Sequence, residues 1–491
     1  MGLRSLGRVV LASVLTVAAA VAVSGTARAA GTGPCDIYAS GGTPCVAAHS
    51  TTRALFGSYG GSLYQVRRWS DGATANIGVL GAGGYANAAT QDNFCAGTYC
   101  TIVRIYDQTS RHNDLTIAPG GGANPTGDQG ANAAALPVTA GGHKVYGIYM
   151  SAGNGYRNNA TNGVATGSAP EGMYMVTEGT HVNNRCCFDY GNAETNNMDT
   201  GNGDMDAIYF GTLCWFSPCS GANPKVMADL ENGLFAGGNG SNTANTGRNS
   251  AFVTAMTKNN GTTTYAIKDG NAQSGGLATR YNGGLPTQSG YRPMTKQGAI
   301  ILGIGGDNSN GSVGSFFEGV MTSGYPSDAT ENAVQSNIVA VGYAKSVTFP
   351  VNGGTYRLTN LAAGKVLDAI NCGTGDGTLL DVWQNLGNSC QQWRFTSVGP
   401  NKWTITNVNS GKVLDAQNCG LALGTVAQLW SSLGNTCQQW AVIPAGNGRY
   451  ELVVENSGMV LDDVNCGSAN GNRVNMWMWL NNTCQLWSFS S

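Results

Sequence analysis

Two carboxylates, Asp229 and Glu231, stand two residues apart in the segment KVMADLENGLF, residues 225–235. Apolar residues alternate with them, which is the period of a β-strand. Side chains two apart on a strand share a face, so the pattern predicts that both carboxylates point the same way. Like charges this close raise at least one pKa, a cost that suits a glycosidase cleft better than a structural sheet. The alternative is a solvent-facing polar stripe.

Two further motifs have residue types that could serve the same chemistry. The segment GIGGDNSNG, residues 303–311, places Asp307 after an apolar strand and glycines, which let a backbone approach a ligand closely. Cys186 and Cys187 are adjacent, and a bond between them would form a rigid ring with a flat sulfur face. The alternatives are an ordinary Asp-Asn turn and two cysteines that pair with distant partners.

The protein has 14 cysteines, an even number that is typical of a disulfide set in an exported chain. Zinc binding is disfavoured, because only four histidines are present and no C-x-x-C pair repeats. The spacing favours local pairs and, with them, the vicinal bond. The predicted disulfides are Cys35–Cys45, Cys95–Cys100, Cys186–Cys187, Cys214–Cys219, Cys372–Cys390, Cys419–Cys437 and Cys466–Cys484.

The first 29 residues have the pattern of a signal peptide. Arg4 and Arg8 precede an apolar run over 9–23, and Ala27-Arg28-Ala29 is a small-x-small cleavage site. The run is shorter than a membrane span requires. Removing residues 1–29 leaves 23 basic against 28 acidic residues, a net charge of −5. This charge disfavours nucleic acid or an anionic membrane as partner. The signal-peptide pattern predicts a secreted, soluble protein, and we expect a monomer.

The composition is that of an all-β protein. Only 11% of the residues are charged, glycine occurs 73 times, and turn-forming residues recur throughout. In residues 30–346 these features predict a β-sandwich domain, with a helix over 328–346. Its clearest predicted strands are 101–106, 173–176, 207–210 and 299–304.

Residues 352–491 contain a threefold repeat that follows a short connector at 346–354. Cys372, Cys419 and Cys466 are each 47 residues apart, and a Cys-Gln-x-Trp motif closes each unit. Three such strand-rich units can bury one core when they pack about an axis. This region resembles the ricin-type β-trefoil lectin family, in which the tryptophan of Gln-x-Trp is a core residue; here these are Trp393, Trp440 and Trp487.

The lectin resemblance implies three sugar pockets, each with an aspartate, an aromatic platform and a glutamine. An indole stacks on the apolar face of a sugar, and a carboxylate accepts hydrogen bonds from its hydroxyls. The asparagine that usually precedes the glutamine is a cysteine in all three repeats. The matching residues are Asp368, Trp383 and Gln391; Asp415, Trp430 and Gln438; and Asp462, Trp477 and Gln485.

The first domain resembles glycoside hydrolase family 54, the secreted α-L-arabinofuranosidases, over nearly all of residues 33–346. The segments that carry the resemblance are GPCDIY (33–38), CVAAHSTTRAL (45–55), CCFDYGNAE (186–194) and EGVMTSGYPSD (318–328), together with the motifs around Glu231 and Asp307.

This resemblance implies a retaining mechanism on a β-sandwich, without a cofactor or a metal. Glu231 would be the nucleophile and Asp307 the acid/base, two carboxyl groups about 5–5.5 Å apart. Asp229, Asn232 and the Gly306 backbone would hold sugar hydroxyls. The Cys186–Cys187 face would pack against the furanose ring.

Two departures from the family bear on specificity. Gly233 stands where the family usually has a second asparagine, and the loop closed by Cys214 and Cys219, which carries Trp215 and Phe216, could shape the aglycone side. Other polar residues in family-like stretches are interpreted as turn or packing residues. They are His49, Asp107, Asp189, Glu194 and Glu318.

The sequence therefore predicts an exo-acting arabinofuranosidase for plant cell-wall arabinoxylan or arabinan, tethered by its lectin domain. One alternative keeps the chemistry but changes the sugar to xylose or galactofuranose. Another is a carbohydrate-binding protein without turnover.

Overall fold

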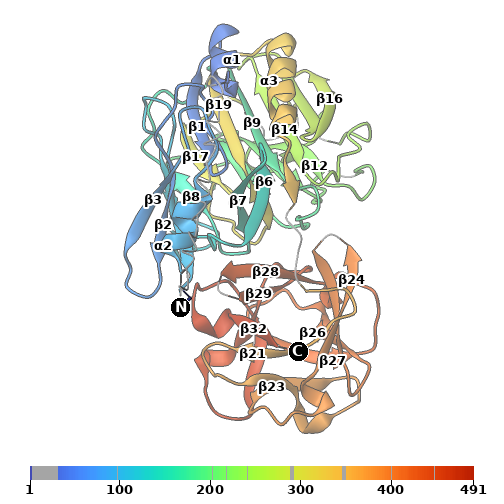
Figure 1. The fold of residues 1–491 in the computed structure, drawn as a ribbon. Coiled ribbons are helices and arrows are strands. Elements are labelled where there is room, and N and C mark those ends of the chain that lie inside the picture. The colour runs from blue at the N-terminus through green and yellow to red at the C-terminus, as the bar shows by residue number, and fades with distance from the viewer. Residues whose placement is uncertain are drawn as a thin grey trace.

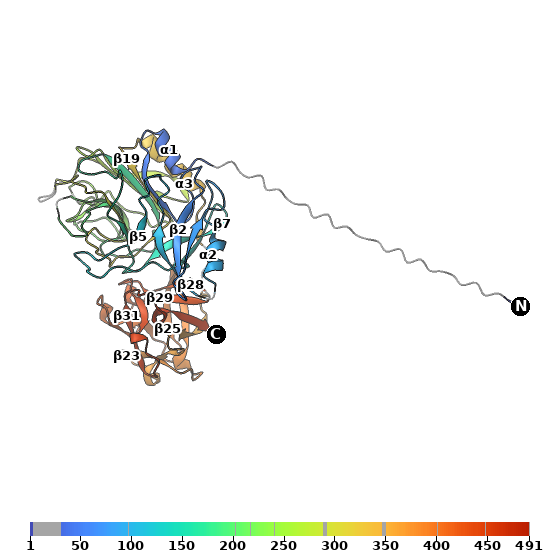
Figure 2. The ribbon, with the colours of Figure 1, turned by 90° about the vertical axis from the view of Figure 1, so that its left-hand side faces the viewer.

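The computed structural model describes residues 1–2, 31–96, 98–201, 203–216, 218–239, 241–287, 292–345, 350–399, 401–446 and 448–490. Nearly all of the predicted signal peptide lies outside these ranges. Residues 31–345 and 350–490 form two bodies that lie one above the other (Figure 1), and the same division is visible from the side (Figure 2). None of the described helices has the length and apolar character needed to cross a bilayer.

The first body is built on two large antiparallel sheets. One has the strand order β1-β19-β9-β14-β15-β16 and the other the order β13-β12-β11-β10-β17-β8-β5-β4-β2-β3. The bounds of the first sheet, in that order, are Cys45–Ser50, Glu318–Ser323, Glu171–Thr177, Val253–Asn259, Tyr265–Asn271 and Ser274–Gly283. Those of the second are Leu234–Phe235, Lys225–Asp229, Asp206–Gly211, Asp189–Ala193, Ala299–Leu302, Tyr156–Asn158, Leu115–Ile117, Cys100–Ile105, Ser62–Arg68 and Thr74–Gly78.

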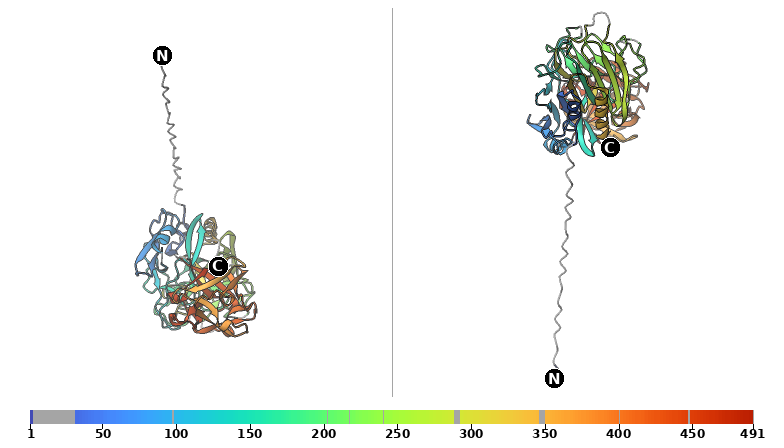
Figure 3. Two further views of the ribbon diagram at one scale, coloured as in Figure 1. Left: turned by 60° about the horizontal axis from the view of Figure 1, so that its bottom comes forward. Right: turned by 90° about the horizontal axis from the view of Figure 1, so that it is seen from above.

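Smaller elements flank the two sheets. A four-stranded sheet has the order β18-β7-β6-β20, and the helices α1 and α3 pack against each other. Seen from above, α3 runs over the strands of the first sheet (Figure 3, right). The remaining bounds are β18 Gly314–Phe316, β7 His143–Met150, β6 Leu136–Ala140, β20 Ala344–Lys345, α1 Pro34–Ser40, α2 Ala88–Phe94 and α3 Asp328–Ala340.

The core of the first body lies between the two large sheets. Tyr174 of β9 and Ala255 of β14 belong to the same buried cluster as Tyr190 of β10, Ile208 of β11 and Ile300 of β17. Such a cluster, formed by side chains from the inner faces of two sheets, is a β-sandwich core. The β-sandwich prediction is therefore confirmed, and all four predicted strands are present as β4, β9, β11 and β17.

The predicted helix over 328–346 is six residues too long. It begins at Asp328, where the Ser327 hydroxyl accepts a hydrogen bond from Thr330 N, and ends at Ala340. Gly342 has φ +64°, a left-handed conformation that ends helices, and residues 344–345 form strand β20 instead.

The second body is a β-trefoil of twelve strands, β21 to β32, whose three repeats surround one core (Figure 3, left). The bounds are Thr355–Asn360, Val366–Ala369, Thr378–Trp383, Trp393–Gly399, Lys402–Asn407, Val413–Ala416, Thr425–Trp430, Trp440–Gly446, Arg449–Val454, Val460–Asp463, Asn472–Trp477 and Trp487–Ser490. Six short 3-10 helices, η1 to η6, span Ile370–Cys372, Ser389–Gln391, Gln417–Cys419, Thr436–Gln438, Val464–Cys466 and Thr483–Gln485.

The repeated tryptophans hold the trefoil core together. Trp393, Trp440 and Trp487 are fully buried, and each indole N–H donates to a backbone carbonyl at 3.0–3.1 Å, those of Leu367, Leu414 and Leu461. The predicted structural role of these residues is confirmed, as are all seven predicted disulfides.

The third repeat of the trefoil packs against the sandwich. Tyr99 and Tyr149 of the sandwich share an apolar cluster with Ile443 and Trp479 of the trefoil. The Tyr99 hydroxyl donates to the carbonyl of Asn481 at 2.6 Å. In the first two repeats the equivalent loops, 384–389 and 431–436, are largely exposed. The lectin is thus fixed to the sandwich through its third repeat and through strand β28, which closes the second repeat.

We expect Trp479→Ala to lower the free energy of unfolding by about 3 kcal/mol, because a fully buried indole leaves a cavity at the domain contact. Leu433→Ala is the control: Leu433, in the equivalent loop of the second repeat, is 62% exposed, so its loss should change stability by about 0.5 kcal/mol or less. Denaturant titration of the two variants tests this. Equal shifts would show that the contact contributes no stability.

Candidate active site

The segment that carries Asp229 and Glu231 is a strand followed by a turn. Strand β12 ends at Asp229, and Glu231 and Asn232 have φ +58° and +59° before β13 begins at Leu234. The prediction that one strand continues through Glu231 is wrong. Asp229 Oδ1 instead accepts a hydrogen bond from Glu231 N at 2.9 Å, which stabilises the turn. Left-handed backbone at non-glycine residues is often found at functional sites.

This turn brings both carboxylates to one cavity of about 220 Å³. Its walls also contain the predicted residues Asp307, Asn232, Gly306 and Cys186. The structure thus brings most of the predicted catalytic and substrate-binding residues together around one cavity. Further lining residues are Glu194, Asp199, Met205, Trp215, Gly233, Leu234, Gly305 and Ser309.

The glycine-rich segment contributes Asp307 to the lining of the same cavity. Its backbone carbonyl accepts from Ala123 N at 3.0 Å, and its Oδ1 accepts from Ser309 N at 3.0 Å. Gly306 lies so close to Glu194 that a Cβ there would come within 2.1 Å of a carboxylate oxygen. Gly306, the third glycine of the motif, is therefore required by close packing.

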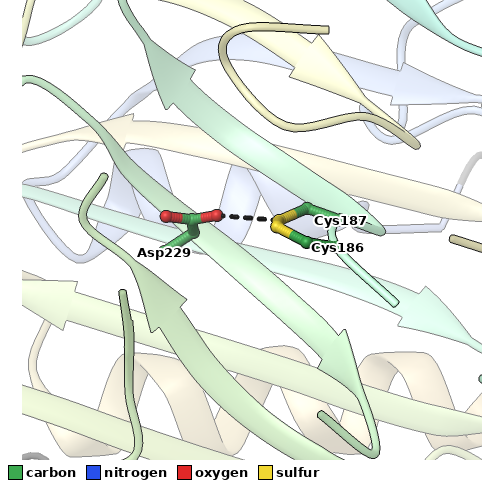
Figure 4. Close-up of side chains that lie close together, drawn as sticks. All are labelled: Cys186, Cys187 and Asp229. Atoms are coloured by element: carbon green, nitrogen blue, oxygen red, sulfur yellow. Dashed lines mark hydrogen bonds between the residues drawn. A yellow bond between two sulfur atoms is a disulfide. The ribbon is translucent and has the colours of Figure 1, made fainter. Parts of the chain in front are cut away.

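Cys186 and Cys187 form the predicted vicinal disulfide, across a cis peptide bond. Figure 4 shows the pair facing Asp229, and Cys187 Sγ lies 3.1 Å from Asp229 Oδ2. These three residues are spaced as metal ligands would be. However, the sulfurs are bonded to each other and are not thiolates, so they do not form a zinc site.

Asp229 has a buried carboxyl partner, Asp189 of β10. Asp189 is fully buried, and burial, followed by the charge of Asp229, raises its pKa well above the usual value. The two side chains share a hydrogen bond, in which the protonated Asp189 donates to Asp229. Burial raises the pKa of Asp229 to about 6. The N–H of Glu231 and the hydrogen bond from Asp189 both oppose this rise. Asp189 thus supports a pocket residue.

Glu231 is almost buried, and burial raises its pKa to about 7. The N–H groups of Gly201 and Thr200 oppose this rise, whereas the neighbouring Asp199 adds to it. Thr200 N donates to Glu231 Oε1 at 2.5 Å, and no donor among the described residues reaches Oε2. One oxygen is thus fixed by a backbone N–H, and the other is buried without a donor among the described residues.

Sequence reasoning does not assign Glu194 or Asp199 to the site. Glu194 follows β10 and is interpreted from the sequence as a packing residue, although its position after a buried strand is a usable signal. Asp199 lies in a polar loop with no sequence pattern to single it out. Trp215, in the Cys214–Cys219 loop, lines the cavity and is 51% exposed, consistent with the expected place of this loop beside the pocket.

Three residues of family-like stretches are scaffold, as predicted. His49 contacts the Tyr190 hydroxyl at 3.0 Å and the Asn113 carbonyl at 2.8 Å. Asp107 accepts hydrogen bonds within its own loop, and Glu318 forms a buried ion pair with Arg53 at 2.5 Å.

The trefoil places each predicted lectin triad together, and its members have different exposure. Trp383, Trp430 and Trp477 are half-buried, which leaves part of each ring accessible. The glutamines are buried and hydrogen-bonded to the loop that follows each tryptophan: Gln391 to Leu386 N and Gln384 O, Gln438 to Leu433 N and Ser431 O, and Gln485 to Leu480 N and Met478 O. These glutamines therefore shape the pockets from behind.

The three pockets differ in the residue opposite the aspartate. Asp415 faces Gln428, which donates to its Oδ1 at 2.8 Å. Asp368 faces a second carboxyl group, Asp381, whose pKa is raised to about 7 by burial and then by the charge of Asp368. In the third repeat Asp462 faces Asn475. Of the three, the second pocket has the fully paired carboxylate.

A β-sandwich with paired carboxylates in one cavity defines a glycoside-hydrolase type of site. Comparison with known families gives the particular one. The family described as "Alpha-L-arabinofuranosidase B, catalytic" matches residues 34–344. The family described as "Ricin-type beta-trefoil lectin domain-like" matches residues 346–430, 389–477 and 436–491. The chain belongs to the family 54 α-L-arabinofuranosidases and carries a ricin-type lectin domain.

Relatives support this membership. The "Alpha-L-arabinofuranosidase" of Hypocrea jecorina is 59% identical over 339 residues, 68% of this chain and 67% of that protein. The "Arabinofuranosidase/B-xylosidase" of Trichoderma koningii is 58% identical with the same coverage. A solved arabinofuranosidase complexed with arabinofuranosyl-α-1,2-xylobiose has a TM-score of 0.79 and 39% identity, covering 94% of this chain and 99% of that one. Relatives from four Aspergillus species, 58–61% identical, are matched over 62–66% of their length.

We expect Asp189→Asn to retain substrate turnover within about threefold of wild type, because a carboxamide can still donate to Asp229. Asp189→Leu leaves Asp229 without this donor, and kcat/KM should fall by about 10- to 100-fold. Steady-state kinetics on an aryl glycoside, beside thermal unfolding of each variant, measures the difference. Comparable loss in both variants would mean that Asp189 is needed as a carboxylate.

Proposed function

We propose that the protein is a secreted, retaining exo-α-L-arabinofuranosidase that removes terminal arabinofuranosyl residues from arabinoxylan or arabinan. The observation that carries this proposal is the single cavity that joins Glu231, Asp307 and the Cys186–Cys187 disulfide. Family membership supports arabinofuranose as the sugar that is released. The seven disulfides and the sequence pattern of residues 1–29 support export, and we infer a monomer.

In the first step, Glu231 attacks the anomeric carbon and forms a covalent arabinosyl-enzyme. Asp307 gives its proton to the departing glycosidic oxygen. In the second step, Asp307 takes a proton from water, which attacks the anomeric carbon and releases Glu231 as a carboxylate. Two displacements on the same carbon return the original configuration.

The remaining walls of the cavity position the sugar. Asp229, oriented by Asp189, accepts hydrogen bonds from hydroxyls, and Asn232 and the Gly306 backbone contribute further polar groups. The disulfide offers a flat apolar face to the furanose ring. Trp215, exposed at the rim, offers a stacking surface to the next sugar. Gly233 leaves space where the family usually has a side chain.

A plant polysaccharide is the proposed substrate class. The solved relative in complex with arabinofuranosyl-α-1,2-xylobiose supports an arabinoxylan side chain as the group that is removed. β-Xylosidase activity is a second candidate, favoured by the Trichoderma koningii relative named as an arabinofuranosidase and β-xylosidase. Hydrolysis of p-nitrophenyl β-D-xyloside beside the arabinofuranoside compares the two.

Glu231→Gln should lower arabinose release from p-nitrophenyl α-L-arabinofuranoside by at least about 10³-fold, because the amide cannot form the glycosyl-enzyme. Asp307→Asn should affect this substrate less than arabinoxylan, since nitrophenolate departs without a proton. Proton NMR of the first product formed should show the configuration of the substrate. Full activity of Glu231→Gln would exclude Glu231 as nucleophile, and an inverted product would exclude the retaining route.

The trefoil is the proposed tether to insoluble polymer, which raises the effective substrate concentration. Replacing Trp383 and Trp430 together by alanine should weaken retention on insoluble arabinoxylan by about tenfold and leave p-nitrophenyl substrate kinetics unchanged. Val408→Ala, an exposed site on the same domain, is the control. Parallel loss on both substrates would contradict the tether.

A further inference from the structure

Glu194 is a buried carboxyl group that the mechanism above does not use. It lies directly after β10, its side chain is fully buried, and it borders the catalytic cavity. Neither carboxylate oxygen has a hydrogen-bond donor from another described residue. A buried carboxylate without donors is strongly destabilised, whereas a neutral carboxylic acid is tolerated.

The carboxyl group of Glu194 packs against the peptide that precedes Asp307. A Cβ added at Gly306 would come within 2.1–2.2 Å of both Glu194 oxygens, which shows how closely the group lies under this backbone. Arg157 fixes the same place from behind, since its guanidinium donates to the carbonyls of both Glu194 and Gly306. A change in the solvation of Glu194 would therefore be transmitted to the loop that carries Asp307.

The charges around Glu194 are mostly negative. Burial raises its pKa to about 8, and the charges of Glu231 and Asp229 add to this effect. Arg157 and the backbone N–H of Glu194 itself oppose it. The charge of Glu194 in turn contributes to the raised pKa of Asp189, at the start of β10. At neutral and acidic pH the group therefore carries its proton.

We propose that Glu194 is a positioning residue that must stay protonated for the Gly306–Asp307 loop to remain in place over the cavity. When Glu194 ionises, its charge requires solvation that this packing does not provide. The loop then moves and Asp307 leaves its position beside the glycosidic oxygen. The proposal rests on the proposed function for its kinetic readout, and it assigns to Glu194 an alkaline limit on activity.

The test is the ratio of kcat/KM for Glu194→Gln to that of wild type, measured on p-nitrophenyl α-L-arabinofuranoside between about pH 5 and pH 9. Glutamine has the same shape and cannot ionise. We expect a ratio near one at about pH 5 and a rise of about tenfold by pH 9, because wild type is then mostly ionised at this residue.

A second readout does not need activity. With a pKa raised in the folded state, Glu194 contributes stability that is complete below the unfolded value, near pH 4.3, and is lost as the pH rises toward 8. The Tm of Glu194→Gln should therefore increase relative to wild type over this range. Glu451→Gln is the matched control: burial raises the pKa of Glu451 to about 8 at the domain contact, so it should alter Tm in the same way but leave the kinetic ratio flat.

Two outcomes would overturn the proposal. A flat kinetic ratio with folded Glu194→Gln would show that its ionisation does not affect the reaction. A large loss of activity in Glu194→Gln at about pH 5 would show that the carboxyl group itself is required. If wild type does not cleave the substrate, the proposed function fails, whereas the Tm comparison still reports the protonation of Glu194.

Discussion

The burial of several carboxyl groups around one small cavity is the constraint on which this site depends. Asp189, Glu194, Asp229 and Glu231 are all buried, and in a medium of low dielectric constant they cannot all be ionised. The protein separates them by local chemistry. Asp189 holds a proton and donates it in a hydrogen bond, Asp229 and Glu231 receive backbone N–H groups, and the Glu194 carboxyl group has no donor from another described residue. Each carboxyl group thereby obtains a different proton affinity and a different task.

A rigid scaffold is needed to hold like charges at this spacing. Strands β10, β11 and β12 are adjacent and antiparallel, with fully buried side chains on both faces. They supply Asp189, Glu194 and Asp229 from fixed backbone. The catalytic candidates themselves stand just beyond regular structure, Glu231 in a left-handed turn and Asp307 after tightly packed glycines. Strand ends thus provide precision, while the turns provide the approach to substrate.

The trefoil shows how one repeated sequence acquires unequal roles. All three repeats use a buried tryptophan whose N–H is bonded to a backbone carbonyl, because the shared core requires it. The surface residues of the three repeats are not subject to this requirement and can differ. The third repeat contributes Trp479 to the contact with the sandwich, while the first two keep the equivalent loops exposed. Attachment through the third repeat and β28 leaves the loops that follow Trp383 and Trp430 exposed.

The sequence by itself determined the all-β class, the division into sandwich and trefoil, the seven disulfides and six of the residues that line the cavity, which are Cys186, Asp229, Glu231, Asn232, Gly306 and Asp307. These features depend on local period, on cysteine spacing and on motifs long enough to be specific. It failed at the turn after β12, where a local bond between side chain and backbone competes with the strand, and where the outcome depends on contacts between distant segments. Alternation predicted a strand through Glu231, but the hydrogen bond from Glu231 N to Asp229 Oδ1 favours a turn. The tertiary structure alone decided that Asp189 supports Asp229, that Glu194 lies under Gly306, and that the third lectin repeat docks on the sandwich together with β28. Such pairings join residues that are far apart in the chain, and their energies depend on burial, which no local pattern records.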